Sequence, residues 1–201
     1  MHNLSNRTLK ILQTPLVLGS ASPRRAELLR AAGIEFDVVH GDVDESVHPE
    51  ELPEAYVRRL ADEKARAVAS GVPDRLVLAA DTTVLIDEVM LGKPADDADA
   101  KRMLYLLSGK THQVLTAVAV YRSGMSGPLI EIERTDVEFA PLTEFEIDWY
   151  VATGEPRDKA GAYAIQGYAS RFVTRIDGSY SNVVGLPIAL VYQMLKGLTT
   201  L

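Results

Sequence analysis

The chain has 201 residues, of which 47% are hydrophobic and 24% charged, so it is long and apolar enough for one globular domain with a substantial core. Its formal net charge of −7 argues against a nucleic-acid binder, because phosphate backbones attract net basic surfaces. The lack of cysteine excludes a disulfide framework, a thiolate nucleophile and cysteine-ligated zinc.

The N-terminal segment has no strong structural pattern. Residues 1–14 (MHNLSNRTLKILQT) lack the apolar stretch and cleavage site of a secretory signal. No apolar run elsewhere approaches the roughly 18 residues that cross a bilayer. We therefore expect a cytoplasmic protein without a membrane partner, with residues 1–14 as an extension and residues 15–201 as a single domain.

The first half of the chain alternates between strand and helix patterns. Ser22 followed by Pro23 is typical of a helix start, with serine at the N-cap and proline at the first helical position. Gly33 suits the C-terminal cap of the same helix. Strands are predicted at residues 15–20, 36–39 and 76–86, and helices at 24–32 and 53–70.

The second half begins with Asp96 and Asp97, which suit a helix start, and later contains a capping box formed by Thr143 and Glu146. Helices are predicted from residue 96 to about 109, at 143–151 and at 187–195, and strands at 112–121, 130–139 and 172–176. Strands and helices alternate around two long adjacent strands. This order predicts an α/β fold with a mixed twisted sheet, flanking helices and two lobes around a cleft.

A strand-to-helix junction at residues 19–25 (GSASPRR) favours an anion. Amides at a helix N-terminus carry partial positive charge, and Arg24 and Arg25 add charge-assisted phosphate contacts beside the hydroxyl of Ser20. A capped helix with solvated arginines is the alternative. The Walker pattern GxxxxGK[ST] is absent.

Two further positions could serve phosphate chemistry. Asp81 interrupts an otherwise apolar strand, which is costly unless the carboxylate is paired or binds a metal, so it is a candidate base or magnesium ligand. The alternative for Asp81 is a structural aspartate at a turn. Lys93, held extended by Pro94, could point across a cleft, although most lysines beside turns are merely solvated.

Carboxylates and an amide complete the set of candidates. Asp42, Asp44 and Glu45 precede the helix that carries Lys64 and could share Mg²⁺ or Mn²⁺ with substrate phosphates, or form a plain acidic loop. Gln166, in the glycine-containing segment DKAGAYAIQG, offers the donor and acceptor that match the imide edge of uracil or thymine. Plain turn chemistry is the alternative for that segment.

Taken together and in this order, eight segments resemble the Maf family of nucleoside triphosphate pyrophosphatases, from about residue 16 to residue 198. They are SASPRR, DVDES, ADEKA, AADTTV, GKP, LSGKTHQVLTAVAV, DKAGAYAIQG and GSYSNVVGLP. The resemblance implies a fold like that of inosine triphosphate pyrophosphatase, with two lobes flanking a nucleotide cleft. It also implies divalent-metal catalysis and usually a homodimer.

The resemblance also implies roles for individual residues. Asp81 would be the proton acceptor that activates water at the α-phosphorus. The triphosphate would be held by Arg24, Arg25, Lys64 and Lys93, and the metal by Asp81 with Asp44 or Glu45.

Base choice in the family divides at three positions, which here read Arg24, Thr82 and Gln166. This combination is similar to the dTTP/UTP pyrophosphatase branch, whereas the branch that hydrolyses 7-methyl-GTP would carry Tyr, Gln and Glu there. The expected activity is therefore hydrolysis of dTTP and UTP to the monophosphate and pyrophosphate. The alternative is a nucleotide-binding regulator of septum formation without significant catalysis.

Overall fold

The computed structural model describes residues 16–199, so the predicted extension at residues 1–14 lies outside the described part of the chain. The strands are β1 (Leu16–Leu18), β2 (Phe36–Val38), β3 (Val77–Ile86), β4 (Val89–Leu91), β5 (Thr111–Tyr121), β6 (Leu129–Phe139) and β7 (Val173–Asp177). The α-helices are α1 (Pro23–Ala31), α2 (Pro53–Ala69), α3 (Asp97–Leu107), α4 (Glu144–Ala152), α5 (Tyr180–Val184) and α6 (Ile188–Thr199). Three 3₁₀ helices, η1 (Glu155–Asp158), η2 (Ala160–Ala162) and η3 (Tyr168–Arg171), connect α4 to β7.

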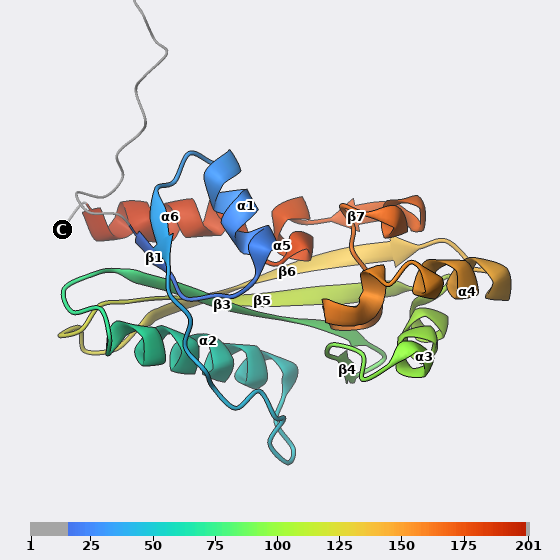
Figure 1. Cartoon of the computed structure of the whole chain (residues 1–201), viewed down its shortest axis with the longest axis horizontal. Coiled ribbons are helices and arrows are strands. Elements are labelled where there is room, and N and C mark those ends of the chain that lie inside the picture. The colour runs from blue at the N-terminus through green and yellow to red at the C-terminus, as the bar shows by residue number, and fades with distance from the viewer. Residues whose placement is uncertain (1–15, 200–201) are drawn as a thin grey trace, which may run out of the picture.

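The strands of the described chain form one mixed sheet in the order β2-β1-β3-β5-β6-β7, with β4 also paired to β3. Strands β2, β1 and β3 are parallel, and the other pairings are antiparallel. Helix α2 covers one face, and α1 and α6 cover the other (Figure 1). The mixed α/β fold predicted from the sequence is therefore confirmed.

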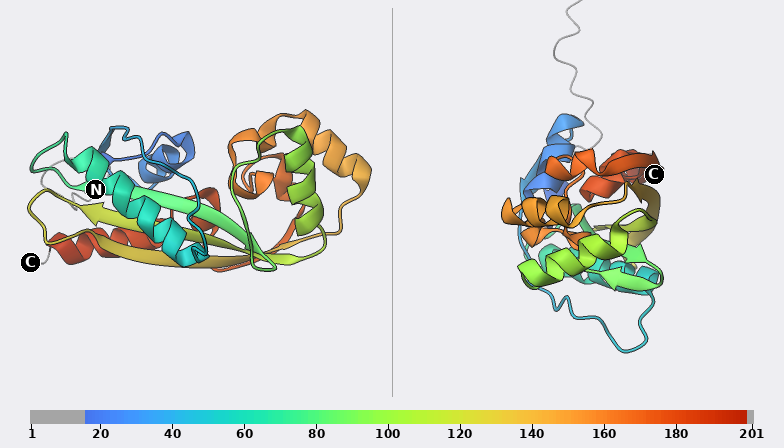
Figure 2. Two further views of the ribbon diagram at one scale, coloured as in Figure 1. Left: turned by 90° about the horizontal axis from the view of Figure 1, so that it is seen from below. Right: turned by 90° about the vertical axis from the view of Figure 1, so that its right-hand side faces the viewer.

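The long strands β3, β5 and β6 run through two lobes (Figure 2). In one lobe they pack against α1, α2 and α6, and in the other their far ends pack against α3, α4 and the 3₁₀ helices. Within this second core, the rings of His112, Phe139 and Tyr163 meet edge to face. Burial lowers the pKa of His112 to about 4, so this histidine is a neutral core residue.

Alternation along β3 sends successive side chains to different helices. Ala79 packs with Ala61 and Ala65 of α2, whereas Leu78 and Ala80 belong to the core under α1 and α6. Because side chains alternate across a sheet, the next two residues, Asp81 and Thr82, also point to opposite faces.

Local signals placed most element boundaries correctly. Gly33 follows α1 with a φ of 68°, and Thr143 and Glu146 form the predicted capping box. Ser22 is the N-cap of α1, but its side chain makes no capping hydrogen bond. Its amide instead donates to Oγ of Ser20 at 3.2 Å. The structure also contains α5 within the segment GSYSNVVGLP, where no helix was predicted from the sequence.

Candidate active site

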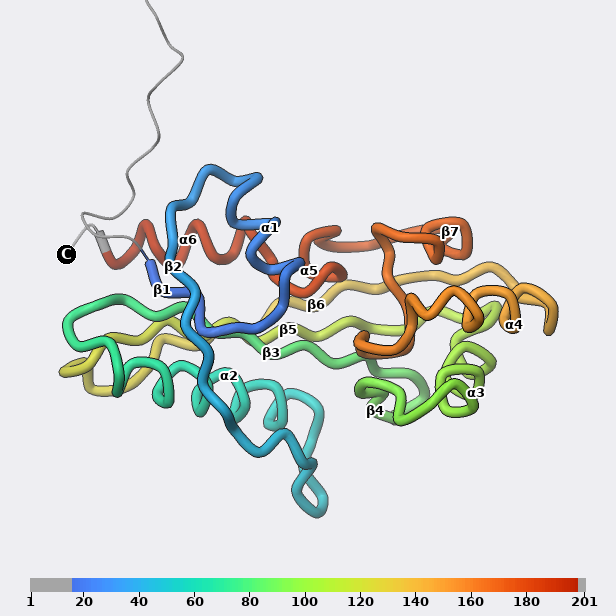
Figure 3. Tube along the Cα trace, viewed as in Figure 1, coloured from blue at the N-terminus to red at the C-terminus, as the bar shows by residue number. Residues whose placement is uncertain are grey.

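A cavity of about 940 Å³ lies at the junction of the two lobes. Its lining comes from the β1–α1 and β2–α2 connections, the middle of β3, the segment after β4 and the region of η1 and η2. The β2–α2 connection runs beside α2 before it enters that helix (Figure 3). The lining includes every site residue predicted from the sequence: Ser20, Arg24, Arg25, Asp42, Asp44, Glu45, Lys64, Asp81, Thr82, Lys93 and Gln166.

The cavity lies against an open edge of β3. Strand β1 pairs with β3 only as far as Leu78, and β4 pairs with it from Val84 onward. In the described chain no strand covers β3 on this side between those two points. The backbone there is reachable by side chains and by a ligand, and Arg25 Nη1 donates to the carbonyl of Ala80 at 2.7 Å.

Asp81 is the most deeply buried carboxylate of the site, with 7% of its surface exposed. Burial raises its pKa, although the charges of Lys64 and Arg25 act in the opposite direction. Lys64 Nζ donates to Asp81 Oδ1 at 2.6 Å. The carboxylate of Asp81, which is costly to bury inside an apolar strand, is thus stabilised by an ion pair with Lys64 of α2.

The charge chain continues from Lys64 to Glu45. Lys64 Nζ lies 2.6 Å from Glu45 Oε1, and Lys93 Nζ lies 3.2 Å from Glu45 Oε2. Burial alone would raise the pKa of Glu45, but the hydrogen bonds and charges of Lys64 and Lys93 lower it overall. Asp81, Lys64, Glu45 and Lys93 therefore alternate in sign across one wall of the cavity.

The structure distinguishes Glu45 from Asp44, which the sequence left as equal candidates. Asp44 Oδ1 accepts a hydrogen bond from the amide of Ser46 at 2.9 Å, and this contact lowers its pKa. Asp44 lines the cavity but has no ion pair with Lys64 or Lys93 in the described chain. Glu45 is therefore the acidic loop residue that converges on Asp81.

Three residues that the sequence reasoning did not single out as site residues hold the Glu45 loop. Tyr56 donates to the carbonyl of Glu45 at 3.0 Å, and Arg59 donates to the carbonyl of Ser46 at 2.9 Å. Arg59 also pairs with Glu51 at 2.7 Å. Burial and the nearby carboxylates raise the pKa of Tyr56 to about 12, so its phenol remains a donor.

The described residues contain no group of three or more histidines, aspartates or glutamates that could hold a metal ion by themselves. Two carboxylates do converge, since Asp81 and Glu45 each lie 2.6 Å from the same ammonium. Carboxylate oxygens suit Mg²⁺ and Mn²⁺, which usually keep water and substrate phosphates among their ligands. The donor set therefore fits a divalent ion if phosphate oxygens complete its coordination.

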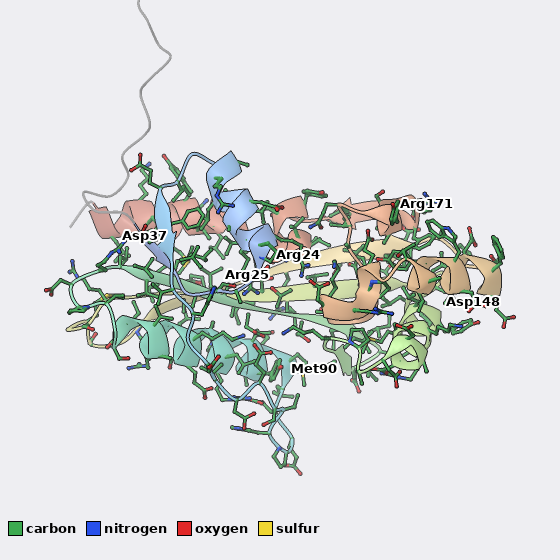
Figure 4. The ribbon with its side chains drawn as sticks, viewed as in Figure 1. Arg24, Arg25, Asp37, Met90, Asp148 and Arg171 are labelled. Carbon is green, nitrogen blue, oxygen red and sulfur yellow. The ribbon has the colours of Figure 1, made fainter. Side chains whose placement is uncertain are left out.

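The two adjacent arginines differ in their surroundings, although both lie at the start of α1 beside the sheet (Figure 4). Arg25 donates to the carbonyls of Gly185 and Ala80 at 2.8 and 2.7 Å. It also donates to the hydroxyls of Ser20 and Thr82, both at 3.1 Å. A guanidinium has five N–H donors, so these contacts engage most of its capacity.

Arg24 instead reaches across the cleft. Its Nη1 donates to Asp158 Oδ2 at 3.2 Å, and Asp158 also pairs with Lys159. Lys159 lines the cavity but was not named as a candidate from the sequence, although its motif was recognised. The lobe that contains α3, α4 and the 3₁₀ helices thus contributes a further cation, Lys159, to the cavity.

Thr82 and Gln166 present different chemistry to the cavity. The hydroxyl of Thr82 accepts from Arg25 and lies 2.9 Å from Oγ1 of Thr116, so the protein already engages it. Gln166 is exposed, and no hydrogen bond within the described chain engages its side-chain amide. Gln166 is therefore the candidate with free donors and an acceptor.

Comparison with known proteins places this architecture among established relatives. Residues 15–198 match the family model described as Maf-like protein. The dTTP/UTP pyrophosphatase of Citrifermentans bemidjiense is 53% identical over 181 residues, covering 90% of this chain and 94% of that protein. The dTTP/UTP pyrophosphatase of an Anaeromyxobacter species is 54% identical over 184 residues, covering 90% of this chain and 88% of that protein.

Solved structures resemble the fold at low identity. The Staphylococcus aureus Ham1 protein superimposes with a TM-score of 0.55 at 16% identity, covering 92% of this chain and 100% of that one. A HAM1 protein from Coxiella burnetii gives a TM-score of 0.51 at 19% identity, covering 93% and 99% of the two chains. These likenesses confirm the expected inosine triphosphate pyrophosphatase-like fold. None of the helices within residues 16–199 is long and apolar enough to span a membrane.

Proposed function

This chain belongs to the Maf-like protein family, and from that premise we propose that it hydrolyses dTTP and UTP to the monophosphate and pyrophosphate. The observation that carries the proposal is the alternating chain of Asp81, Lys64, Glu45 and Lys93 in one cavity wall. This arrangement supplies a positioned base and cations for a polyphosphate. A protein that only senses a nucleotide does not need such a base.

In the proposed reaction, water attacks the α-phosphorus and the bond to the bridging oxygen of the leaving pyrophosphate breaks. Asp81 accepts the water proton, which its burial and raised pKa favour. Lys64, Lys93 and Arg24 neutralise charge that develops on the phosphate oxygens. Arg25 adds positive charge and holds the hydroxyl of Thr82 in place through a hydrogen bond.

A divalent cation, Mg²⁺ or Mn²⁺, is part of the proposal, with Glu45 and Asp81 as its protein ligands and the triphosphate supplying further oxygens. When bound, such an ion would neutralise phosphate charge and orient the α-phosphorus toward water. Both carboxylates already share a cation in the form of the Lys64 ammonium, which supports their ability to share another positive charge.

Recognition of the base is assigned to Gln166, Arg24 and Thr82. The free amide of Gln166 can donate to a carbonyl of thymine or uracil and accept from the ring N–H between the two carbonyls. Cytosine presents an amine in place of one carbonyl and has no such N–H, so it matches less well. A site that hydrogen-bonds one base edge can strongly reject another.

The same proposal places the enzyme in the cytoplasm as a homodimer. Support for the dimer is the family resemblance alone. Light scattering at micromolar concentration tests it, and a mass near the 22.0 kDa of one chain would reject it.

The central test measures pyrophosphate release from dTTP and UTP with Mg²⁺. Asp81→Asn should abolish turnover, because an amide cannot accept the proton, while circular dichroism and the melting temperature stay close to those of the wild type. Wild-type turnover by this variant would remove Asp81 from the mechanism. Nucleotide binding without pyrophosphate release by the wild type would favour a regulator instead.

A further inference from the structure

The loop that carries Gln166 is bound at one end directly to the carboxylate of Glu155, which lies outside the cavity, and at the other end to the hydroxyl of Tyr150, which itself donates to that carboxylate. Glu155 Oε2 accepts from the amide of Tyr168 at 3.0 Å, and Oε1 accepts from the amide of Ala169 at 3.4 Å. On the other side, Glu155 Oε1 accepts from the hydroxyl of Tyr150 at 2.8 Å. That hydroxyl in turn accepts from the amide of Ala164 at 3.1 Å.

The hydrogen bonds of Glu155 and Tyr150 with the amides of Ala164, Tyr168 and Ala169 form a closed frame around Gln166. The chain leaves the frame at Ala164, passes through Gln166 and returns at Tyr168. Within the loop, the amide of Gly167 also donates to the carbonyl of Ala164 at 3.0 Å. Charge-assisted hydrogen bonds to a carboxylate are stronger than neutral ones. The frame therefore restrains the backbone of Gln166.

The packing at Gly167 shows how closely the carboxylate is seated. A Cβ atom at this position would lie 2.1 Å from Glu155 Oε2 and 2.5 Å from Glu155 Cδ, and its three nearest atoms all belong to that carboxylate. Glycine is therefore needed here for close approach, since its φ of −107° is open to other residues. Any larger residue would push Glu155 off the loop.

Tyr150 completes the frame from the core of the second lobe. Its side chain is fully buried in the cluster that includes Phe172, and burial raises the pKa of its phenol. The phenol thus stays protonated and can donate to Glu155 while it accepts from Ala164. Helix α4, which carries Tyr150, connects this frame to the rigid part of the lobe.

We infer that Glu155 is a positioning residue for base selection, acting through Gln166. The inference rests on the proposed function, in which Gln166 reads the base. Glu155, Tyr150 and Gly167 are absent from the described residues that line the cavity, so they act on substrate only through the loop. Their expected effect is on discrimination between bases rather than on the hydrolytic step.

The test compares kcat/KM for dTTP and dCTP, because these two bases differ at the edge that Gln166 would read. In E155Q, one oxygen becomes an amide donor that faces another donor, so one side of the frame opens. The dTTP/dCTP ratio should fall about tenfold, the effect of losing one charged hydrogen bond. KM for dTTP should rise while kcat changes little.

G167A should also separate the Glu155 carboxylate from the loop, while it leaves Glu155 and Gln166 chemically intact. It should reproduce the fall in the ratio if E155Q folds poorly. The matched control is Glu144→Gln, an exposed glutamate at the start of α4, which should keep the wild-type ratio. A general loss of stability would lower both kcat/KM values together and leave their ratio unchanged.

The decisive comparison combines E155Q with Q166A. If Glu155 works through Gln166, the double variant has the same dTTP/dCTP ratio as Q166A alone. An unchanged ratio in both E155Q and G167A, or additive losses in the double variant, would overturn the positioning role while the proposed function stands. A wild type that releases no pyrophosphate from dTTP would overturn the proposed function and this inference with it.

Discussion

Replacing Arg25 by lysine tests whether its guanidinium stabilises the fold or binds the triphosphate. Arg25 binds two carbonyl and two hydroxyl oxygens at 2.7 to 3.1 Å. A lysine keeps the charge, but its single nitrogen cannot span oxygens that lie around a planar fork. At least two of these contacts should therefore be lost in R25K, including one to a backbone carbonyl.

The magnitude follows from those contacts. A hydrogen bond from a charged group contributes roughly 1.5–3 kcal/mol, and water from the cavity favours the lower end, so two lost bonds give about 3 kcal/mol. With a urea m value of about 2 kcal/mol/M for a domain of this size, the unfolding midpoint of R25K should fall by about 1.5 M. Urea denaturation followed by circular dichroism measures this shift.

Arg24→Lys is the matched control, since Arg24 makes a single ion pair with the exposed carboxylate of Asp158. Such pairs contribute about 0–1 kcal/mol, so the midpoint should move by less than about 0.5 M. An R25K midpoint that matches the wild type, together with a large loss of kcat/KM, would refute the reasoning. Arg25 would then act on the triphosphate rather than on the fold.

Three further outcomes are expected. Lys64→Met removes the charge that lowers the pKa of Asp81, so the acid limb of the kcat/KM–pH profile should move to higher pH. An acid limb that stays in place would show that Lys64 does not set the pKa of Asp81. Glu51, whose pKa Arg59 lowers from 4.5 to about 2, gives stability that is present above pH 4.5 and lost as pH falls toward 2. Glu51→Gln should flatten urea stability across that window, and an unchanged slope would contradict this role. Removal of divalent ions by EDTA should stop dTTP hydrolysis and Mn²⁺ should restore it, whereas Glu45→Gln should raise the Mn²⁺ concentration required for half-maximal rate.

The fold was largely accessible to sequence reasoning because its signals are local. Gly33, the Thr143–Glu146 capping box and the periodicity of the long strands depend on neighbouring residues, and the structure places each as predicted. The short helix α5 was missed because five residues provide too little periodicity to separate a helix from a turn.

The candidate site was accessible as a set of residues but not as an arrangement. Every predicted residue lines the cavity, yet nothing in the strand sequence shows which face of the sheet Asp81 takes or that Lys64 of α2 meets it there. The partners of Arg25 come from positions 55 and 160 residues away, which no local pattern reports. Glu155 was passed over because its role depends on a loop that closes around it only in three dimensions.

The unbroken strands β3, β5 and β6 have a mechanical consequence. Each contributes side chains to the cores of both lobes, so no flexible connection between the lobes serves as a hinge within this part of the sheet. Bending would have to distort paired strands, which makes large closing motions costly. We therefore expect a fixed distance between the loop of Gln166 and the carboxylates of Asp81 and Glu45. Under the proposed function, this distance would favour nucleotides whose base and α-phosphorus reach both places at once.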